Sequence, residues 1–190
     1  MKNNLIPALK LTLICAVFFS VIYPLILLGI AQLAPNNGEG EIISDNGKIY
    51  YANIAQSFTG DAWFSSRPSA VNYNAAGSGG SNKGPSNPDY LKEVSARIDT
   101  FLVHNPGIEK SDIPADLVTA SGSGLDPDIS IEAARIQAKR IAEARDVPEA
   151  AVQNVIDACM QKPWLGCFGT EKVNVLKLNV LLDANTGSVR

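Results

Sequence analysis

The sequence has few of the residues that an independent catalytic or metal site requires. It holds one histidine, His104, and three cysteines among 190 residues. Ser-His-Asp catalysis would have only that one base, and no G-x-S-x-G nucleophile motif accompanies it. Four ligands for a structural zinc ion are equally hard to assemble from this set. We therefore expect no autonomous active site and no metal centre.

The glycine-rich segments also lack the patterns that bind phosphate. A P-loop needs lysine directly after its last glycine, whereas Lys83 precedes Gly84 here. A dinucleotide-binding loop would need glycine where Asn82 stands. We interpret these loops as segments that permit close backbone packing or cover a partner. No cofactor is expected to be held by this chain alone.

Positive charge is scarce beyond the N-terminus. Without Lys2 and Lys10, 14 of the 16 basic residues remain against 19 acidic ones, which gives the rest of the chain a net charge of about −5. Five arginines are interpreted as surface or ion-pair groups. They are Arg67, Arg97, Arg135, Arg140 and Arg145. An acidic domain of this kind predicts no nucleic-acid partner.

A long apolar run near the N-terminus predicts a membrane helix. No residue from Leu11 to Leu33 carries a charge, and as a helix the run reaches about 34 Å, enough to cross a bilayer. Pro24 is expected to kink this helix rather than end it. A cleavable signal peptide is the alternative, but its apolar core would be shorter than this run.

Flanking charges predict the orientation of the helix. Lys2 and Lys10 precede it and Glu39 and Glu41 follow it, so the positive-inside rule places the N-terminus in the cytoplasm. Membrane lipid is thus one expected partner. The expected organisation is a cytoplasmic N-terminus, a transmembrane helix, a linker and an extracytoplasmic domain, over residues 1–10, 11–33, 34–47 and 48–190.

Helix starts are marked by capping residues in the expected domain. Asn87 before Pro88 predicts one helix, and Ser130 predicts another. Asp146 with Glu149 three residues later resembles a capping box for a third helix.

Strands are expected at both ends of this domain. Apolar runs predict a strand at 48–54, an extended piece at 62–64 and a strong last strand at 173–182. A shift of apolar phase in the last run suggests a bulge near Val175. Strands around central helices predict an α+β fold: one N-terminal transmembrane helix followed by a small extracytoplasmic mixed α/β domain.

Two kinds of residue leave alternatives open. Cys159 and Cys167 are separated by seven residues, and in an oxidising compartment they could form a disulfide or remain free. Asp126 and Asp128 could contribute to a cation site, or they could be acids that favour the following helix start.

Several motifs, in a fixed order, resemble the C subunit of the Kdp-type potassium-transporting ATPase over essentially the full length. They include Tyr23-Pro24, the run Trp63 to Ala70, Gly79-Gly80-Ser81-Asn82, Leu117 to Asp126, Gln137-x-x-Arg140-x-Ala142-x-Ala144-Arg145 and Val173 to Asn179.

This resemblance implies a non-enzymatic subunit of a potassium uptake pump in the bacterial inner membrane. Its implied partners are a channel-like potassium-binding subunit and a P-type ATPase subunit, with ATP reaching the complex through the latter. The family is described as a catalytic chaperone that raises ATP affinity, and the glutamine matching Gln137 is proposed to contact nucleotide. With an extracytoplasmic domain, that effect would instead have to pass through the membrane subunits.

The motifs also supply candidate partner contacts. They lie in the polar segments before the first helix and before Ser130, where a recognition surface is expected. The candidates are Phe64, Arg67, Pro68, Ser69, Gly79, Gly80, Ser81, Asn82, Ser121, Gly122, Ser123, Gly124 and Asp126.

Overall fold

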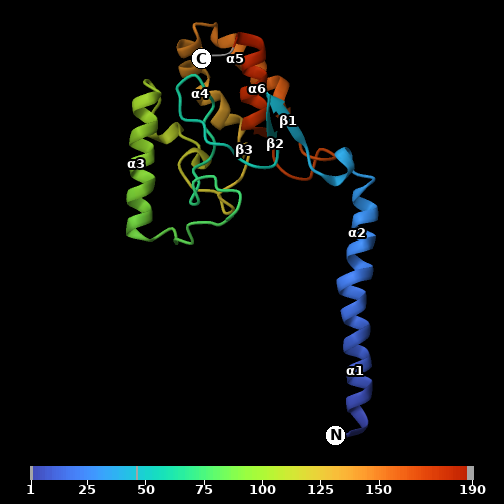
Figure 1. The fold of residues 1–190 in the computed structure, drawn as a ribbon. Helices are drawn as coiled ribbons and strands as arrows, with labels where there is room; N and C mark the ends of the chain where they lie inside the picture. Colours follow the sequence, from blue (N-terminus) through green and yellow to red (C-terminus); the bar gives the residue numbers. More distant parts are fainter. Residues whose placement is uncertain (1, 46, 188–190) are drawn as a thin grey trace. The chain divides into compact units, whose positions relative to one another are not determined.

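The computed structural model describes residues 2–45 and 47–187 of the chain, which divide into two units between Glu41 and Ile42. The first unit is an apolar helix, and the second, called here the C-terminal domain, contains mixed helix and sheet (Figure 1). The expected fold class is confirmed.

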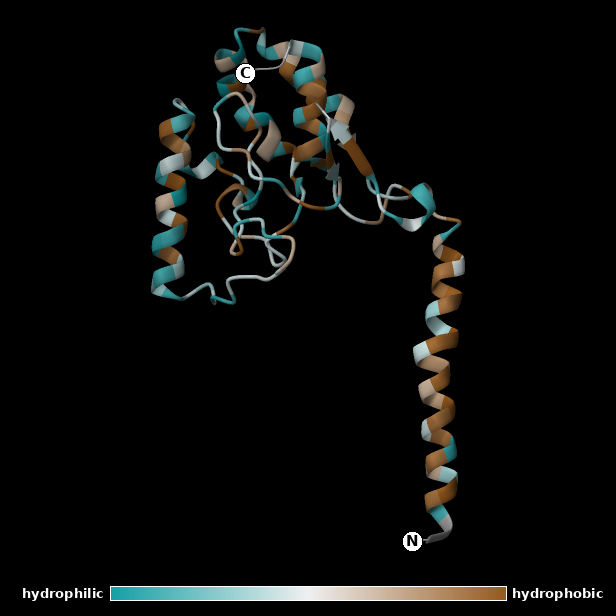
Figure 2. Cartoon of the chain, in the orientation of Figure 1, coloured by the Kyte–Doolittle hydropathy of each residue, from teal (hydrophilic) through white to brown (hydrophobic). Residues whose placement is uncertain are grey.

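The first unit is helical almost throughout. It comprises α1 (Lys2–Val17), a π-helical turn (Phe18–Ile22) and α2 (Tyr23–Ala31). The stretch Asn4–Ala31 is long and apolar enough to span a membrane, and its apolar side chains are exposed along its length (Figure 2). The π-helical turn ends two residues before Pro24, and Tyr23 N–H bonds to Phe18 O. The wider turn accommodates a ring that would collide with a regular helical backbone.

Short antiparallel strands form two small sheets in the C-terminal domain. Strand β1 (Ile42–Asp45) pairs with β2 (Lys48–Tyr51), so part of the expected linker is a hairpin strand. The second sheet has the order β3-β5-β4. Its strands are β3 (Asp128–Ile129), β4 (Met160–Gln161) and β5 (Lys172–Asn174).

Two helices begin where capping residues predicted them. In α3 (Pro88–His104) the Asn87 side chain accepts bonds from two backbone amides, and in α4 (Ile131–Arg145) the Ser130 hydroxyl accepts one from Ala133. Two single 3₁₀ turns, Lys110–Asp112 and Ala115–Leu117, lie between these helices.

The expected capping box at Asp146 was wrong, although the helix exists. Helix α5 (Glu149–Cys159) follows Pro148 and has no side-chain cap. Asp146 instead ends α4 in the left-handed conformation, at φ 54°. Asp tolerates this region better than most residues, which suits it to a helix end.

The expected last strand was also wrong beyond its first residues. The chain leaves β5 at Asn174 and continues as α6 (Val175–Thr186). Asn174 caps this helix by accepting a bond from Lys177 N–H at 3.0 Å. The apparent bulge near Val175 is therefore the junction of a strand and a helix, where the apolar period changes from two to 3.6 residues. The expected extended piece at 62–64 forms no strand, and residues 62 and 63 lie in a turn and a bend.

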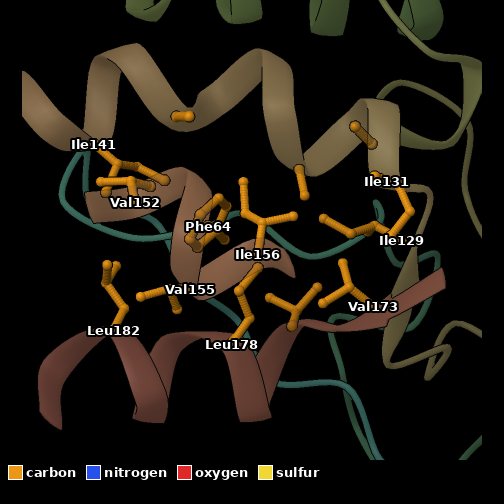
Figure 3. Packing of buried hydrophobic residues seen from close by; sticks show 14 of the residues in the cluster. Phe64, Ile129, Ile131, Ile141, Val152, Val155, Ile156, Val173, Leu178 and Leu182 are labelled. Carbon is orange, nitrogen blue, oxygen red and sulfur yellow. The ribbon is translucent and has the colours of Figure 1, made fainter. Parts of the chain in front are cut away.

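The core lies between α4, α5 and α6. Figure 3 shows the ring of Phe64 among side chains from these helices, including Ile141, Ile156 and Leu178, all fully buried. Phe64 belongs to a segment without regular structure, so one irregular stretch crosses the centre of the domain.

Candidate functional site

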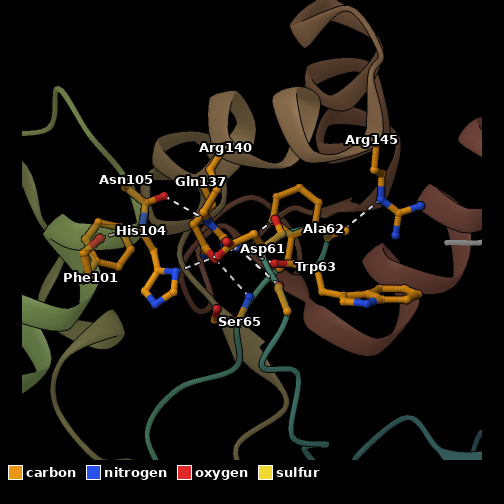
Figure 4. Close-up of polar contacts among 12 residues, drawn as sticks. Asp61, Ala62, Trp63, Ser65, Phe101, His104, Asn105, Gln137, Arg140 and Arg145 are labelled. Carbon is orange, nitrogen blue, oxygen red and sulfur yellow. Dashed lines mark hydrogen bonds and ion pairs between the residues drawn. The ribbon is translucent and has the colours of Figure 1, made fainter. Parts of the chain in front are cut away.

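Gln137 lies inside the domain and has all its polar atoms bonded. Its Oε1 accepts bonds from Ser65 N–H at 2.9 Å and from Arg140 Nη2 at 2.8 Å, while Nε2 donates to Ala133 O at 2.9 Å (Figure 4). The side chain is 0% exposed. A ligand would reach it only if the segment around Ser65 moved away.

Arg140 is the centre of the same network. Its guanidinium donates to the carbonyls of Gly60, Asp61 and Trp63, to Asn105 Oδ1 and to Gln137. Burial lowers the pKa of Arg140, and the nearby Asp61 carboxylate acts in the opposite direction. The carbonyls of the turn at residues 60–63 have no sheet partner, and the Arg140 guanidinium supplies hydrogen-bond donors to them instead.

Arg145 holds the neighbouring part of this turn. It donates from Nε to Ala62 O at 2.7 Å, pairs with Asp183 at 2.7 Å and lies over the Trp63 ring, 4.6 Å from its centroid. Its side chain is only 1% exposed. Arg140 and Arg145 were expected to be surface or ion-pair groups, and both form ion pairs, with Asp61 at 3.5 Å and with Asp183 at 2.7 Å. Their burial, and their bonds to an irregular segment in the interior, were not expected.

Two buried asparagines were missed at the sequence level. Asn179 bonds both the N–H and the carbonyl of Phe64, at 2.9 and 3.0 Å. Asn174 donates to Ala52 O at 2.6 Å. Polar residues at inward positions of α6 would have signalled this role, had the segment been predicted as a helix.

The candidate contact residues before α3 and before α4 come together in space. Arg67 pairs with Asp126 at 2.9 Å, and Ser69 Oγ donates to Gly124 O at 2.7 Å. Backbone bonds complete the junction, from Gly79 N–H to Ser123 O and from Ser121 N–H to Pro68 O. We call these two segments, 67–82 and 121–126, the paired loops.

Glycine is required where the paired loops touch. Gly124 has φ +68°, and a Cβ there would lie 2.6 Å from Val71 Cγ2 and 2.8 Å from Gly79 O. A Cβ on Gly80 would lie 2.9 Å from Gly122 O. The interpretation of these glycines as sites of close backbone packing is confirmed.

Exposure separates the candidate contacts into three groups. Phe64 is core and is unavailable to a partner, and Ser121 and Gly124 are buried within the paired loops. Asn82, Gly122 and Ser123 are exposed, and the remaining candidates are half-buried. A partner would therefore meet the rims of the loops, and that contact stays a prediction.

The remaining candidates have simple local roles. An acidic cleft of about 700 Å³ contains Asp126 and Asp128, which pair with Arg67 and Lys172. His104 is exposed and contacts Asp61 at 2.8 Å.

Cys159 and Cys167 are free thiols in the structure, so their pairing stays a prediction. Among the residues described, no group of three or more histidine, cysteine or acidic side chains is placed to hold a metal ion.

Comparison with known proteins covers nearly the whole chain. Residues 5–184 match the family described as "KdpC: K+-transporting ATPase, c chain". A potassium-transporting ATPase KdpC subunit of Flavobacterium psychrophilum is 57% identical over 95% of this chain and 98% of its own length. The KdpC subunit of Bacteroides fragilis is 52% identical over 95% and 97%. That of Caldanaerobacter subterraneus is 46% identical over 92% and 91%.

The matched region includes the apolar helix, the paired loops and the network around Gln137. The resemblance stated from the motifs is therefore confirmed by both family and relatives. This chain belongs to the KdpC family, the c chain of K+-transporting ATPases.

Proposed function

We propose that the chain is a non-catalytic subunit of an ATP-driven, high-affinity potassium uptake pump, which it helps to assemble and stabilise. In this proposal a channel-like subunit binds potassium and a P-type ATPase subunit hydrolyses ATP. The supporting observation is membership of the c-chain family over residues 5–184. The paired loops offer a preformed surface for these partners, because their backbones are bonded to each other before any partner binds.

The proposed location is the bacterial inner membrane, with the N-terminus in the cytoplasm and the C-terminal domain outside. Lys2 and Lys10 before the uncharged run that begins at Leu11, and acidic residues after it, support this orientation. A single exposed cysteine would test it, for example Ser95→Cys on α3 in a chain whose own cysteines are replaced by serine. A membrane-impermeant maleimide should label intact cells, and labelling only after lysis would contradict the orientation.

The same proposal includes a catalytic chaperone role, in which the subunit raises the ATP affinity of the ATPase subunit. Gln137 is buried and bonded to Ser65, Arg140 and Ala133, which favours an indirect effect over contact with nucleotide. An indirect effect is a coupling free energy between subunits, and it is reciprocal for binding. ATP should therefore tighten the attachment of this chain to the ATPase.

Co-purification tests the subunit assignment. Membranes solubilised in mild detergent, with a C-terminal tag on this chain, should yield the other two subunits and potassium-stimulated ATP hydrolysis. Omitting the chain should raise the KM for ATP of the remaining complex. A tagged chain recovered alone, under conditions that preserve other membrane complexes, would instead favour a free-standing anchored binding module of the cell envelope.

A further inference from the structure

A short turn between β4 and β5 exposes large apolar side chains. Trp164, Leu165 and Phe168 are 71%, 73% and 61% exposed. We call residues 163–168 the apolar tip. Burying such side chains normally stabilises a fold, and none of the three contributes to the core. Their placement therefore calls for an occupant outside the domain.

The apolar tip is built by backbone bonds rather than left irregular. Trp164 and Phe168 exchange two bonds, at 2.9 and 3.0 Å, and their rings lie 5.8 Å apart. Leu165 has φ 53° and Gly166 has φ 75°. A bulky residue with positive φ is strained, so leucine at this exposed position is of no benefit to the turn itself.

A second apolar surface occurs where the domain begins. Ile42 pairs with Tyr51, and Ser44 pairs with Ile49, so these residues share one face of the β1–β2 hairpin. Ile42, Ile49 and Tyr51 are 40%, 67% and 45% exposed. The apolar colour of β1 is visible in Figure 2.

The connection to the apolar helix keeps this end of the domain near a membrane. Gly38 approaches Ala31 so closely that a Cβ would lie 2.8 Å from the Ala31 Cβ, which folds the start of the linker onto the helix end. Only Glu39–Glu41 then precede β1, and four peptide steps reach at most about 14 Å. Whatever the arrangement of the two units, Ile42 stays within that reach of Gly38.

We propose that the apolar tip inserts into the headgroup region of the lipid bilayer that holds the apolar helix. Tryptophan, phenylalanine and leucine suit this region, and the exposed Lys162 at the base of the tip can remain in water. The domain is acidic, so insertion depends on apolar contact rather than on attraction to anionic lipid. The inserted tip restricts the domain's rotation and presents a fixed face to other subunits.

The two tryptophans of the chain provide the test and its control. The Trp63→Phe variant leaves Trp164 as the only tryptophan, and Trp164→Phe leaves Trp63, which is partly buried against Arg145. The full chain is incorporated into phosphatidylcholine vesicles with and without bromine on the acyl chains. Insertion to about 5–10 Å predicts a blue-shifted Trp164 emission that loses about half its intensity in brominated vesicles, with little loss for Trp63.

Further variants make each result decisive. In the Trp63→Phe chain, Leu165→Ser with Phe168→Ser should abolish the quenching, while the circular dichroism stays that of the parent. Incorporation without quenching of Trp164 would overturn the proposal alone, and failure to incorporate would overturn the anchor as well. If Trp164 is shielded from aqueous acrylamide but unaffected by brominated lipid, a protein surface covers the tip, and the lipid assignment is wrong.

Discussion

Replacing Gln137 by alanine should destabilise the C-terminal domain by about 2–4 kcal/mol. The change removes the acceptor of the Ser65 amide, and one buried unpaired donor costs about 1–3 kcal/mol. It also leaves a cavity where a fully buried side chain stood. The lost bond from Arg140 Nη2 adds less to this cost, because Nη2 still donates to Trp63 O at 3.1 Å.

Thermal unfolding followed by near-UV circular dichroism measures this effect. For a chain of this size, 1 kcal/mol lowers the Tm by about 2–4 °C, so Gln137→Ala should lower it by about 5–15 °C. Gln137→Glu loses the bond that Nε2 donates to Ala133 O, but it keeps both accepted bonds and places a carboxylate beside Arg140, so it should destabilise the domain less than Gln137→Ala. Lys139→Ala, on the exposed side of the same helix, is the matched control and should change stability by no more than about 0.5 kcal/mol.

Pump activity separates this structural role from nucleotide contact. In the assembled complex, Gln137→Glu should leave the KM for ATP near its original value once equal amounts of complex are compared. A raised KM together with an unchanged Tm in Gln137→Ala would refute the reasoning, because a residue that only supports the loop cannot alter ATP binding without altering stability.

Two further predictions follow from single contacts, and two concern the cysteines. Gly124→Ala should destabilise the domain by about 1–3 kcal/mol in urea unfolding, because residue 124 has positive φ and the new methyl group would collide with Val71 and Gly79. Gly122→Ala is the control and should be nearly neutral, because a Cβ there has no atom within 4 Å. Asn174→Ala should destabilise the domain by about 1–3 kcal/mol, because it removes the α6 cap and the bond to Ala52 O. Asn185→Ala, in the exposed last turn of α6, is the control and should change stability little. Equal urea unfolding midpoints for the two variants would contradict the capping role. If Cys159 and Cys167 pair in an oxidising compartment, alkylation without reductant should modify neither, and mass spectrometry that finds both modified would contradict pairing. After reduction, Cys159 should react faster as the pH rises, because burial raises the pKa of its thiol and favours the neutral form below that pKa.

Local signals predicted the helices that begin at a side-chain cap. Asn87 and Ser130 cap α3 and α4 as expected, because these bonds involve only neighbouring residues. The last helix was missed because the run 173–182 satisfies a strand pattern in part, and its true start depends on Asn174. Short apolar runs fit either period until the partner surfaces are known.

The sequence predicted which residues belong to the candidate site, but it did not predict how deeply they are buried. Motif order brought the residues of the paired loops into one set, and the structure joins them through Arg67, Ser69 and their partners. The burial of Gln137 and Arg140 was signalled only by their spacing from Ala133 and Ile141 on one face of α4. Glutamine and arginine are mostly exposed in folded proteins, so residue type alone gave the wrong expectation for these two side chains.

The polar motif residues in the interior all hydrogen-bond to one irregular segment, and that segment also forms part of the surface. Residues 52–87 contain no helix or strand, so their backbone groups cannot be satisfied by a sheet ladder. Gln137, Arg140, Arg145 and Asn179 supply the missing donors and acceptors around Phe64. The same segment continues directly into the paired loops. Substitutions in α4 should therefore alter partner binding without touching a partner, because they release the segment that fixes the loop rims.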